Sequence, residues 1–426
     1  MNALLRIPYA VAGAVAQSLA YIVPDGGSKL QRGLVARRGI LTRYRRWASA
    51  SRDPSRPLVW FHAPSVGEGL QALPVIQLLR SRRPDVQIVY THYSPSAADF
   101  ARSTGADFAD YLPFDSFGAA AAAISAIRPT VLVFSKLDVW PALTETAGRC
   151  GVKLGLISAT LPEASARRNV FARHALDDAY RALDRVGAIS DDDANRLTQQ
   201  GVRAGRVSVT GDTRYDQVWT RAHAPTSPLV QSLRSSTPTL VAGSTWPADE
   251  EELLPAWIEL KKKISRPRLI IAPHELSEGH LKTIVNWAGL NRLKLSRVAD
   301  IGARESDVIL VDRYGVLGDA YALADVAYVG GGFHAAGLHS VLEPAAYGAP
   351  VLFGPRHARS HEASALLSSG GAHVVNDRAE IARRLEDLLG LTKSRDASGA
   401  AARAVVERGL GAAERSYQLV TELLGR

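Results

Sequence analysis

Short apolar runs alternate with helix-like stretches along most of this 426-residue chain, and the alternation occurs in two blocks. The runs that predict strands occupy residues 57–63, 86–91, 131–134, 153–158, 186–190 and 207–210 in the first block, and 239–243, 268–273, 308–311, 326–331, 350–354 and 373–375 in the second. Strands that alternate with helices form parallel sheets covered by helices on both faces. The sequence therefore predicts an α/β protein with two Rossmann-like parallel-sheet domains facing a central cleft.

The interval between the blocks, residues 222–238, is polar and contains prolines, which predicts a linker. We expect an N-terminal domain over residues 51–221 and a C-terminal domain over residues 239–400. Residues 401–426 are expected to form a helix that packs back on the N-terminal domain. The alanine-rich stretch 115–127 predicts a helix between two strands of the first block, since alanine favours helices over strands.

The net charge of +9 comes mainly from one basic segment, residues 26–51, which contains no acidic side chain. Its seven cations are Lys29, Arg32, Arg37, Arg38, Arg43, Arg45 and Arg46. The rest of the chain is close to charge balance, which favours an anionic membrane surface over nucleic acid as the partner. Tyr44 and Trp47 suggest an interfacial location for this segment rather than stacking on bases.

An uncharged apolar stretch, residues 7–23, precedes the basic segment. As a helix it would be about 25 Å long, slightly short of a hydrocarbon core of about 30 Å. A signal peptide and a buried helix are alternatives, but a membrane-anchoring or interfacial helix also explains the basic segment. We therefore expect residues 1–50 to hold the protein at the cytoplasmic face of a membrane, either spanning the bilayer or lying on it.

Three loops between strands and helices could carry chemistry, because ligands of parallel sheets bind beyond the carboxyl ends of the strands. They read HAPSVGEG (62–69), GSTWPADEEE (243–252) and GGGFHAAGLHSVLEPAAYG (330–348). In the third loop, glycines and a helix start at Ser340 favour a phosphate, and Glu343 could bind a ribose. A tight turn capped by Ser340 is the alternative. Residues 330–335 also fit a dinucleotide fingerprint, but residues 344–361 contain no acid, which disfavours an NAD-dependent dehydrogenase.

The acidic side chains of these loops have simpler interpretations as well. Residues 191–193 and 249–252 are predicted to be acids in the first turns of helices, and Ser244 and Thr245 either cap a helix or bind an anion. Glu68 lies between two glycines at a predicted strand end. It could be a general base toward a hydroxyl or only a helix-start acid, and the local sequence favours the second interpretation.

Taken together, these loops resemble the 3-deoxy-D-manno-octulosonic acid (Kdo) transferases of Gram-negative bacteria, which are GT-B glycosyltransferases. The matching segments run in the family's order over nearly the whole chain: the N-terminal apolar and basic segments, HAPSVGEG, SKLDVWP (135–141), SATLPEAS (158–165), VTGDTRYDQV (209–218), VAGSTWPADEEE (241–252), IAPHE (271–275) and residues 330–355. The resemblance implies a GT-B fold and transfer of Kdo from CMP-Kdo to a lipid A precursor at the inner membrane, without a metal ion or cofactor.

The resemblance also implies roles for individual residues. Glu68 would be the general base, with Lys136, Asp138 and Arg214 as further catalytic residues and with Ser65 and Gly67 on the acceptor side. Contacts to CMP-Kdo are implied for Ser244, Thr245, Pro273, His274, Tyr314, Gly315, Val316, Gly331, Gly332, His339, Ser340, Val341, Leu342 and Glu343. Arg214 could offset the charge of the phosphate or of the Kdo carboxylate.

Two motifs depart from the family pattern. Lys136 and Asp138 stand where the common pattern has glutamates, and Pro273-His274-Glu275 replaces a common Pro-Arg-His. Another GT-B enzyme acting on a UDP-sugar, similar to a lipid A disaccharide synthase or an epimerase, is the alternative within the fold. A non-catalytic membrane adaptor that keeps the fold is a third possibility.

Overall fold

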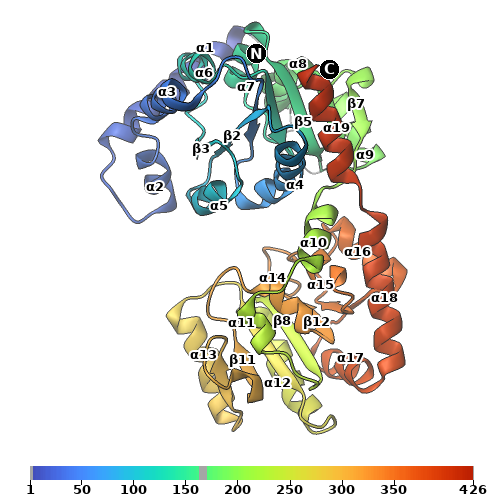
Figure 1. The fold of residues 1–426 in the computed structure, drawn as a ribbon. Helices are drawn as coiled ribbons and strands as arrows, with labels where there is room; N and C mark the ends of the chain where they lie inside the picture. The colour runs from blue at the N-terminus through green and yellow to red at the C-terminus, as the bar shows by residue number, and fades with distance from the viewer. Residues whose placement is uncertain (1–2, 163–169, 426) are drawn as a thin grey trace. The chain divides into compact units, whose positions relative to one another are not determined.

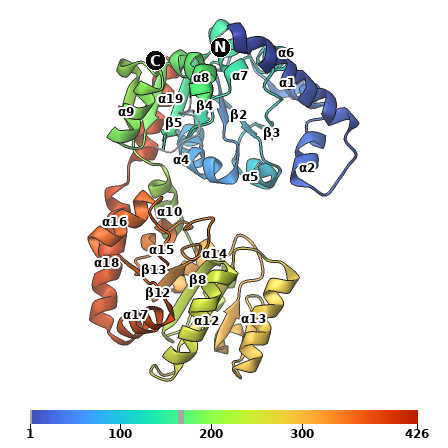
Figure 2. The same ribbon diagram turned by 180° about the vertical axis from the view of Figure 1, so that it is seen from behind.

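The computed structural model describes residues 3–162 and 170–425. The chain divides into an N-terminal unit, Met1–Gln217 with Gly411–Arg426, and a C-terminal unit, Val218–Leu410. Each unit contains a seven-stranded parallel sheet with helices on both faces (Figures 1 and 2). Two Rossmann-like units of the GT-B type are confirmed.

In the N-terminal unit the strand order is β3-β2-β1-β4-β5-β6-β7. The strands are β1 Leu58–His62, β2 Gln87–His92, β3 Phe108–Tyr111, β4 Val131–Ser135, β5 Lys153–Ala159, β6 Arg185–Ala188 and β7 Val207–Val209. The helices are α1 Ala3–Ile22, α2 Lys29–Val35, α3 Ile40–Ser51, α4 Val66–Arg82, α5 Ala98–Ser103, α6 Phe117–Ile127, α7 Pro141–Arg149, α8 Val170–Ala182, α9 Asp191–Gln199 and α19 Ala412–Leu424. Helix α10 Arg214–His223 crosses into the C-terminal unit.

In the C-terminal unit the strand order is β10-β11-β9-β8-β12-β13-β14. The strands are β8 Thr239–Thr245, β9 Arg268–Pro273, β10 Leu295–Arg297, β11 Val308–Leu310, β12 Val326–Val329, β13 Val351–Phe353 and β14 Ala372–Val374. The helices are α11 Pro228–Ser232, α12 Pro247–Lys261, α13 Glu278–Leu290, α14 Leu317–Ala320, α15 Leu342–Ala346, α16 His361–Ser369, α17 Arg378–Gly390 and α18 Thr392–Arg408.

The central strands form because their apolar runs are covered on both faces. Every residue of β1 and β4 is buried, as expected for parallel strands between two helical layers. The sequence predicted every strand except β3 and β10. Neither strand contains a fully buried residue, and both include polar side chains (FADY in β3 and LSR in β10), so neither has an apolar run that a sequence pattern could mark.

The boundaries between the units lie at different residues from those expected. Residues 222–238 belong to the C-terminal unit, because α11 lies within them, Leu233 is buried, and the Arg268 guanidinium donates to the Leu233 carbonyl at 2.7 Å. Helix α18 also belongs to this unit, so the return to the N-terminal unit begins at Gly411 rather than at residue 401.

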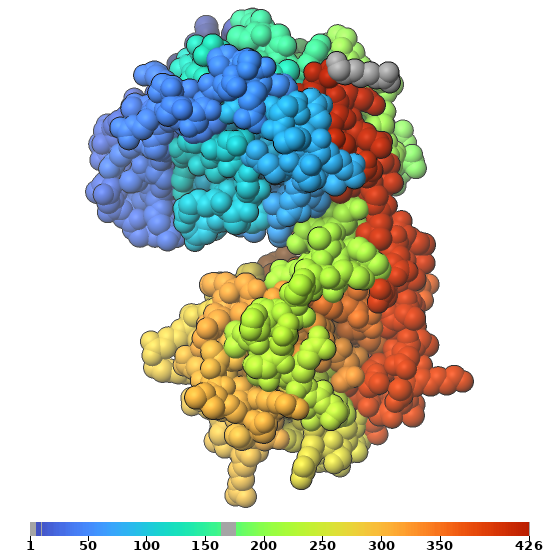
Figure 3. Space-filling model, in the orientation of Figure 1, coloured from blue at the N-terminus to red at the C-terminus, as the bar shows by residue number. Residues whose placement is uncertain are grey.

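The C-terminal helix α19 supplies part of the N-terminal core. Leu419, Val420 and Leu423 pack with Val133 and Ile157 of the sheet. The opposite side of α19 is polar and lies at the molecular surface, where it is red in Figure 3. The helix is therefore amphipathic and completes the cover of this sheet.

Part of the basic segment is structural. Arg37 is buried and donates to the carbonyl groups of Gly33, Tyr93 and Leu112, while Arg43 forms an ion pair with Asp110. The interfacial location expected for Tyr44 is wrong, because its side chain is fully buried. Trp47 is half-buried and stacks on Phe108 at 5.0 Å between ring centroids.

The apolar stretch at the N-terminus forms α1, which contains Pro8 and extends from Ala3 to Ile22. The helix packs closely on the start of α6, since a Cβ atom at Gly13 would lie 3.1 Å from the Ser116 Cβ atom. Across the described ranges, no helix combines the length and the apolar character needed to traverse a bilayer.

Candidate active site

The strand order identifies where each sheet can bind a ligand. Neighbouring strands whose connections run to opposite sides of a parallel sheet leave a crevice beyond their carboxyl ends. In the N-terminal unit these strands are β1 and β4, and in the C-terminal unit they are β8 and β12. The loops that follow them are three of the predicted motifs and the segment that begins at Lys136.

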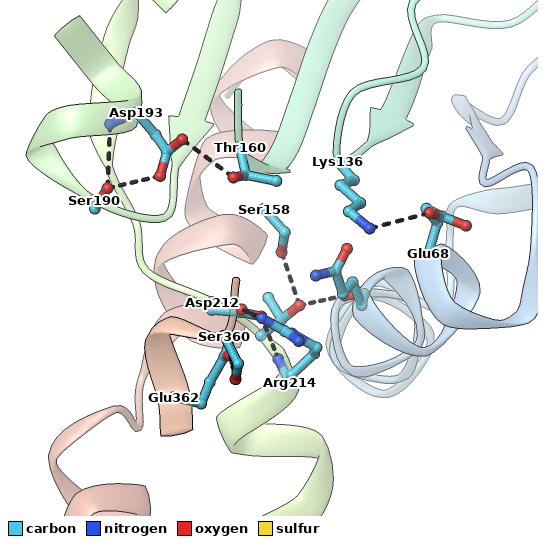
Figure 4. A network of polar contacts seen from close by, with 12 residues as sticks. Glu68, Lys136, Ser158, Thr160, Ser190, Asp193, Asp212, Arg214, Ser360 and Glu362 are labelled. Carbon is cyan, nitrogen blue, oxygen red and sulfur yellow. Dashed lines mark hydrogen bonds and ion pairs between the residues drawn. The ribbon is translucent and has the colours of Figure 1, made fainter. Parts of the chain in front are cut away.

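Glu68 lies in the first turn of α4, directly after β1, and Lys136 follows the end of β4. The Lys136 Nζ atom lies 3.3 Å from a carboxylate oxygen of Glu68 (Figure 4). The Ser65 hydroxyl donates to the other oxygen. The Ser135 hydroxyl donates to the Glu68 carbonyl at 2.9 Å. The two strand ends thus bring together an acid and a cation that are far apart in the sequence.

The surroundings of Glu68 favour its ionised form. Burial alone would raise the pKa of the carboxyl group, but the Ser65 hydroxyl and the Lys136 ammonium group outweigh burial and hold the pKa below its usual value. The side chain is 18% exposed, so it is shielded yet remains accessible. Glu68 is therefore a helix-start acid and also a carboxylate that is ionised at neutral pH.

The glycines beside Glu68 differ in what they do. A Cβ atom at Gly69 would lie 2.4 Å from the Phe100 ring, so this position requires close packing. A Cβ atom at Gly67 would meet only the Ser65 hydroxyl oxygen, at 3.7 Å, which leaves space beside the carboxylate.

The other predicted catalytic residues have separate surroundings. Arg214 donates to Asp212 through three nitrogens at 2.6–2.9 Å, so an acid of its own already balances its charge. Asp138 is half-buried in the loop between β4 and α7. Lys136 has a φ of 68°, a strained value for a side-chain-bearing residue of the kind that gathers at functional sites.

A cavity of about 280 Å³ lies beyond β8, β9 and β11 in the C-terminal unit. Five residues predicted to contact CMP-Kdo are in its wall: Ser244, Pro273, His274, Tyr314 and Gly315. Ser244, like Lys136, has a positive φ, of 53°. Arg221 and Arg313 also line the cavity, and each already pairs with an acid: Arg221 with Asp319 at 3.1 Å and Arg313 with Asp312 at 3.5 Å.

The glycine-rich loop after β12 is held by Asp249, which is fully buried. Its carboxylate accepts hydrogen bonds from the backbone N–H groups of Trp246 (2.9 Å), Gly331 (2.7 Å) and Phe333 (3.2 Å). The Tyr328 hydroxyl adds a fourth at 3.2 Å. Asp249 thereby fastens the loops after β8 and β12 to each other.

Close packing explains the glycines of this loop. A Cβ atom at Gly331, which has a φ of 91°, would lie 2.2 Å from the Gly337 carbonyl oxygen, and one at Gly332 would lie 2.3 Å from the Gly354 nitrogen. Three histidines surround the indole ring of Trp246. Its ring centroid lies 4.1 Å from that of His334 and 4.5 Å from that of His274, and its N–H donates to His339.

The segment after this loop differs from the prediction. The helix begins at Leu342 and not at Ser340, and α15 has only five residues, so its dipole offers little to an anion. The side chains of Val341 and Leu342 are buried, which leaves only their backbone for a ligand. Burial raises the pKa of the Glu343 carboxyl group, while Arg221 opposes the rise.

Thr245 is also less available than its motif suggested. Its hydroxyl is buried and donates to a carboxylate oxygen of Glu250 at 2.7 Å. The other oxygen of Glu250 lies 2.9 Å from His280 Nε2, and His280 Nδ1 lies 3.1 Å from the Glu275 carbonyl. This chain connects the loop after β8 with the loop after β9.

Sequence reasoning missed the importance of Asp249, Glu250 and Trp246. The first two were interpreted as ordinary helix-start acids. That interpretation holds for Asp191 and Asp192 in the first turn of α9, whereas Asp193 is buried, accepts from the Leu161 N–H group at 2.7 Å and pairs with Arg196. The available signal was their place beside a strand-to-helix loop that contains the Trp-Pro pair 246–247. Only the folded chain shows that Asp249 and Glu250 are buried.

Comparisons with known proteins find similar sequences over most of the chain. Residues 37–217 match the family model described as 3-deoxy-D-manno-octulosonic-acid transferase (kdotransferase). The 3-deoxy-D-manno-octulosonic acid transferase of Bordetella pertussis is 29% identical over 397 residues, which cover 90% of this chain and 91% of that protein. The Haemophilus influenzae protein of the same name is 25% identical over 400 residues and 92% of each chain.

Solved structures share the fold at low sequence identity. The UDP-GlcNAc 2-epimerase from Neisseria meningitidis bound to UDP-GlcNAc superposes with a TM-score of 0.63 at 13% identity, over 87% of this chain and 99% of that one. A glycosyltransferase from Rickettsia africae gives a TM-score of 0.56 at 10% identity, over 87% and 99%. At these identities the likeness shows the fold alone.

Proposed function

We propose a specific reaction for this chain, which belongs to the 3-deoxy-D-manno-octulosonic acid (Kdo) transferase family and is therefore a glycosyltransferase. The reaction moves Kdo from CMP-Kdo to a lipid A precursor such as lipid IVA, in lipopolysaccharide core biosynthesis. The observation that carries the proposal is the ionised carboxylate of Glu68, held by Ser65 and Lys136 at the crevice of the N-terminal sheet.

In the proposed mechanism, Glu68 accepts a proton from the hydroxyl group of the lipid acceptor. The acceptor oxygen forms a bond to the anomeric carbon of Kdo while the bond from that carbon to the phosphate oxygen of CMP breaks. The electron pair of the broken bond leaves with CMP. A single displacement of this kind inverts the configuration at the anomeric carbon.

The C-terminal cavity supports an anionic nucleotide as the donor. It lies at the carboxyl ends of the strands, where nucleotides bind in parallel sheets, and its volume of about 280 Å³ suits part of a nucleotide. Arg221 and Arg313 line the cavity, each held by an ion pair with one carboxylate, Asp319 or Asp312. A charged donor oxygen gains more from such fixed cations than from water, because the cations need no reorganisation.

The N-terminal segment supports a location at the cytoplasmic face of the inner membrane. Apolar side chains of α1 are exposed at helical spacing, with Ile7 73%, Val11 55%, Val15 52% and Ile22 75% accessible. Four cations of the basic segment are exposed and form no ion pair within residues 3–162 and 170–425: Lys29, Arg32, Arg45 and Arg46. An apolar helix face with nearby cations suits binding to the surface of an anionic bilayer, where a phosphorylated lipid acceptor also resides.

Product analysis would test the proposed reaction. Purified protein is mixed with lipid IVA and either CMP-Kdo or a UDP-sugar, and the lipid product is analysed by mass spectrometry. We expect Kdo to be added from CMP-Kdo, whereas transfer from a UDP-sugar alone would refute the proposal.

A variant of Glu68 tests the general base. Glu68→Gln should lower the transfer rate about 10²- to 10⁴-fold, the usual contribution of a general base. Transfer by this variant at the wild-type rate would refute the role of Glu68.

A further inference from the structure

Trp246 and His339 are joined by a hydrogen bond that determines which ring nitrogen of His339 carries a proton. The Trp246 Nε1 atom lies 3.1 Å from His339 Nε2. An indole N–H group can only donate, so Nε2 must be the acceptor and carries no proton. A neutral imidazole has its single proton on the other nitrogen, and His339 is therefore the Nδ1–H tautomer.

The position of Trp246 is fixed on several sides. Its backbone N–H donates to the buried Asp249 carboxylate, and Pro247 begins α12 immediately after it. His334 stacks on the indole ring at an interplanar angle of 9°, and His274 at 28°. The backbone of His339 is fixed as well, because its N–H donates to the Gly330 carbonyl at 3.1 Å. The hydrogen bond between the two rings thus joins two anchored residues.

The surroundings of His339 oppose its protonation. An imidazolium ion would have an N–H group on Nε2 directed at the indole N–H, which would remove the hydrogen bond. Burial lowers the pKa of His339 to about 4, and His274 and His334 contribute to the decrease while Asp249 opposes it. His339 is consequently neutral at physiological pH.

The Nδ1 atom of His339 has no hydrogen-bond partner in the described part of the chain, and the side chain is half-buried beside the glycine-rich loop. We propose that Trp246 is a positioning residue, which holds His339 as a neutral Nδ1–H donor to a phosphoryl oxygen of a bound cytidine monophosphate group. The ligand in this inference rests on the donor proposed above, whereas the tautomer follows from the hydrogen bond alone. An uncharged donor of this kind keeps its proton over the whole physiological pH range.

Nitrogen NMR on the full-length protein with ¹⁵N-labelled histidine tests the tautomer. The His339 signals are assigned by their loss in His339→Gln. We expect a protonated Nδ1 and an unprotonated Nε2 at pH 7 in the wild type. Trp246→Phe keeps an aromatic ring but not the donor, and should give a mixture of tautomers with a higher His339 pKa. An Nε2–H tautomer in the wild type would overturn the inference without any variant.

Binding of CMP and of cytidine tests the ligand. Trp246→Phe should bind CMP about 3- to 10-fold more weakly than the wild type, because one hydrogen bond to the phosphate is lost. Its binding of cytidine should stay unchanged. Trp287→Phe is the matched control, because Trp287 lies in the same unit and its indole N–H has no partner among the described residues. Equal weakening for both ligands, or none, would overturn the role toward phosphate. Wild-type protein that does not bind CMP would refute the proposed donor. The tautomer of His339 would still be decided by the NMR experiment alone.

Discussion

Glu68 shows how one residue satisfies two interpretations of its sequence. Its place in the first turn of α4 is the one expected for a helix-start acid. Its carboxylate also contacts Lys136, which the chain supplies from the end of a different strand. Since the pKa of Glu68 lies below its usual value, the group is a weaker base than an isolated glutamate but is ionised at any physiological pH.

Replacing Lys136 should change the pH dependence of transfer. Lys136→Met removes a charge that lowers the pKa of Glu68 and leaves the effect of burial, so the pKa rises. If Glu68 must be ionised to act, the acid limb of the rate profile moves to higher pH. The measurement is the transfer rate against pH, compared with Lys153→Met, which changes an exposed lysine of β5.

The same contacts have a consequence for stability. A carboxyl group with a lowered pKa stabilises the fold above its unfolded pKa, and this contribution is lost as the pH falls through the folded pKa.

The rate profile of Lys136→Met has an outcome that would contradict the role of Glu68. An acid limb at the same pH as in the wild type would show that this limb does not report the ionisation of Glu68.

At the scale of elements, the first turn of α12 organises the C-terminal site. Asp249 accepts hydrogen bonds from backbone N–H groups of the loops after β8 and β12. Glu250 contacts the Thr245 hydroxyl and His280 of α13. Buried carboxylates with several donors are costly to alter, because each donor loses its partner. We infer that α12 sets the geometry of the glycine-rich loop.

Asp249→Ala should therefore destabilise the C-terminal unit by about 3 kcal/mol, because it leaves buried N–H groups unpaired. Hydrogen exchange of residues 329–335 should accelerate before the rest of the unit does. Glu251→Ala is the control, since Glu251 is exposed on the same helix. Urea unfolding followed by mass spectrometry of exchanged peptides measures both effects, and equal behaviour of the two variants would contradict the role of Asp249.

At the scale of the molecule, the basic and apolar residues of the N-terminal segment divide into two groups. Arg37, Arg43 and Tyr44 belong to the fold, whereas the exposed side of α1 and four cations remain for a partner. Large exposed apolar side chains also occur in the C-terminal unit, at Leu290 and Ile301. Exposure alone therefore does not mark a membrane surface, and the combination with charge is the useful criterion.

Cosedimentation with vesicles tests this surface. The double variant Val11→Asp with Val15→Asp should bind anionic vesicles about tenfold less tightly than the wild type, because two apolar side chains no longer enter the bilayer. Leu290→Asp, an exposed apolar residue on the other unit, should bind like the wild type. Binding should also fall with rising salt. Equal loss in both variants would contradict a specific role for α1.

The fold could be predicted from the sequence to a large extent, because long apolar runs between helices are local signals. Strands β3 and β10, which contain no fully buried residue, escaped prediction. The boundaries of the units also escaped it, because they depend on contacts such as that of Arg268 with Leu233. For the candidate sites, sequence motifs marked Glu68 and the glycine-rich loop. Asp249 was not recognised as important, because the sequence of an acidic cluster does not show which of its side chains is buried.

Hydrophobic periodicity, glycine placement and motif order thus determined the two α/β units and the family of this protein by sequence alone. The tertiary structure decided which charges are available, since it pairs Arg214 with Asp212 and Arg43 with Asp110 and leaves Lys136 beside Glu68. The physical reason is range. Secondary structure follows from neighbours along the chain, whereas the ionisation and availability of a side chain depend on groups that only folding brings within a few ångströms.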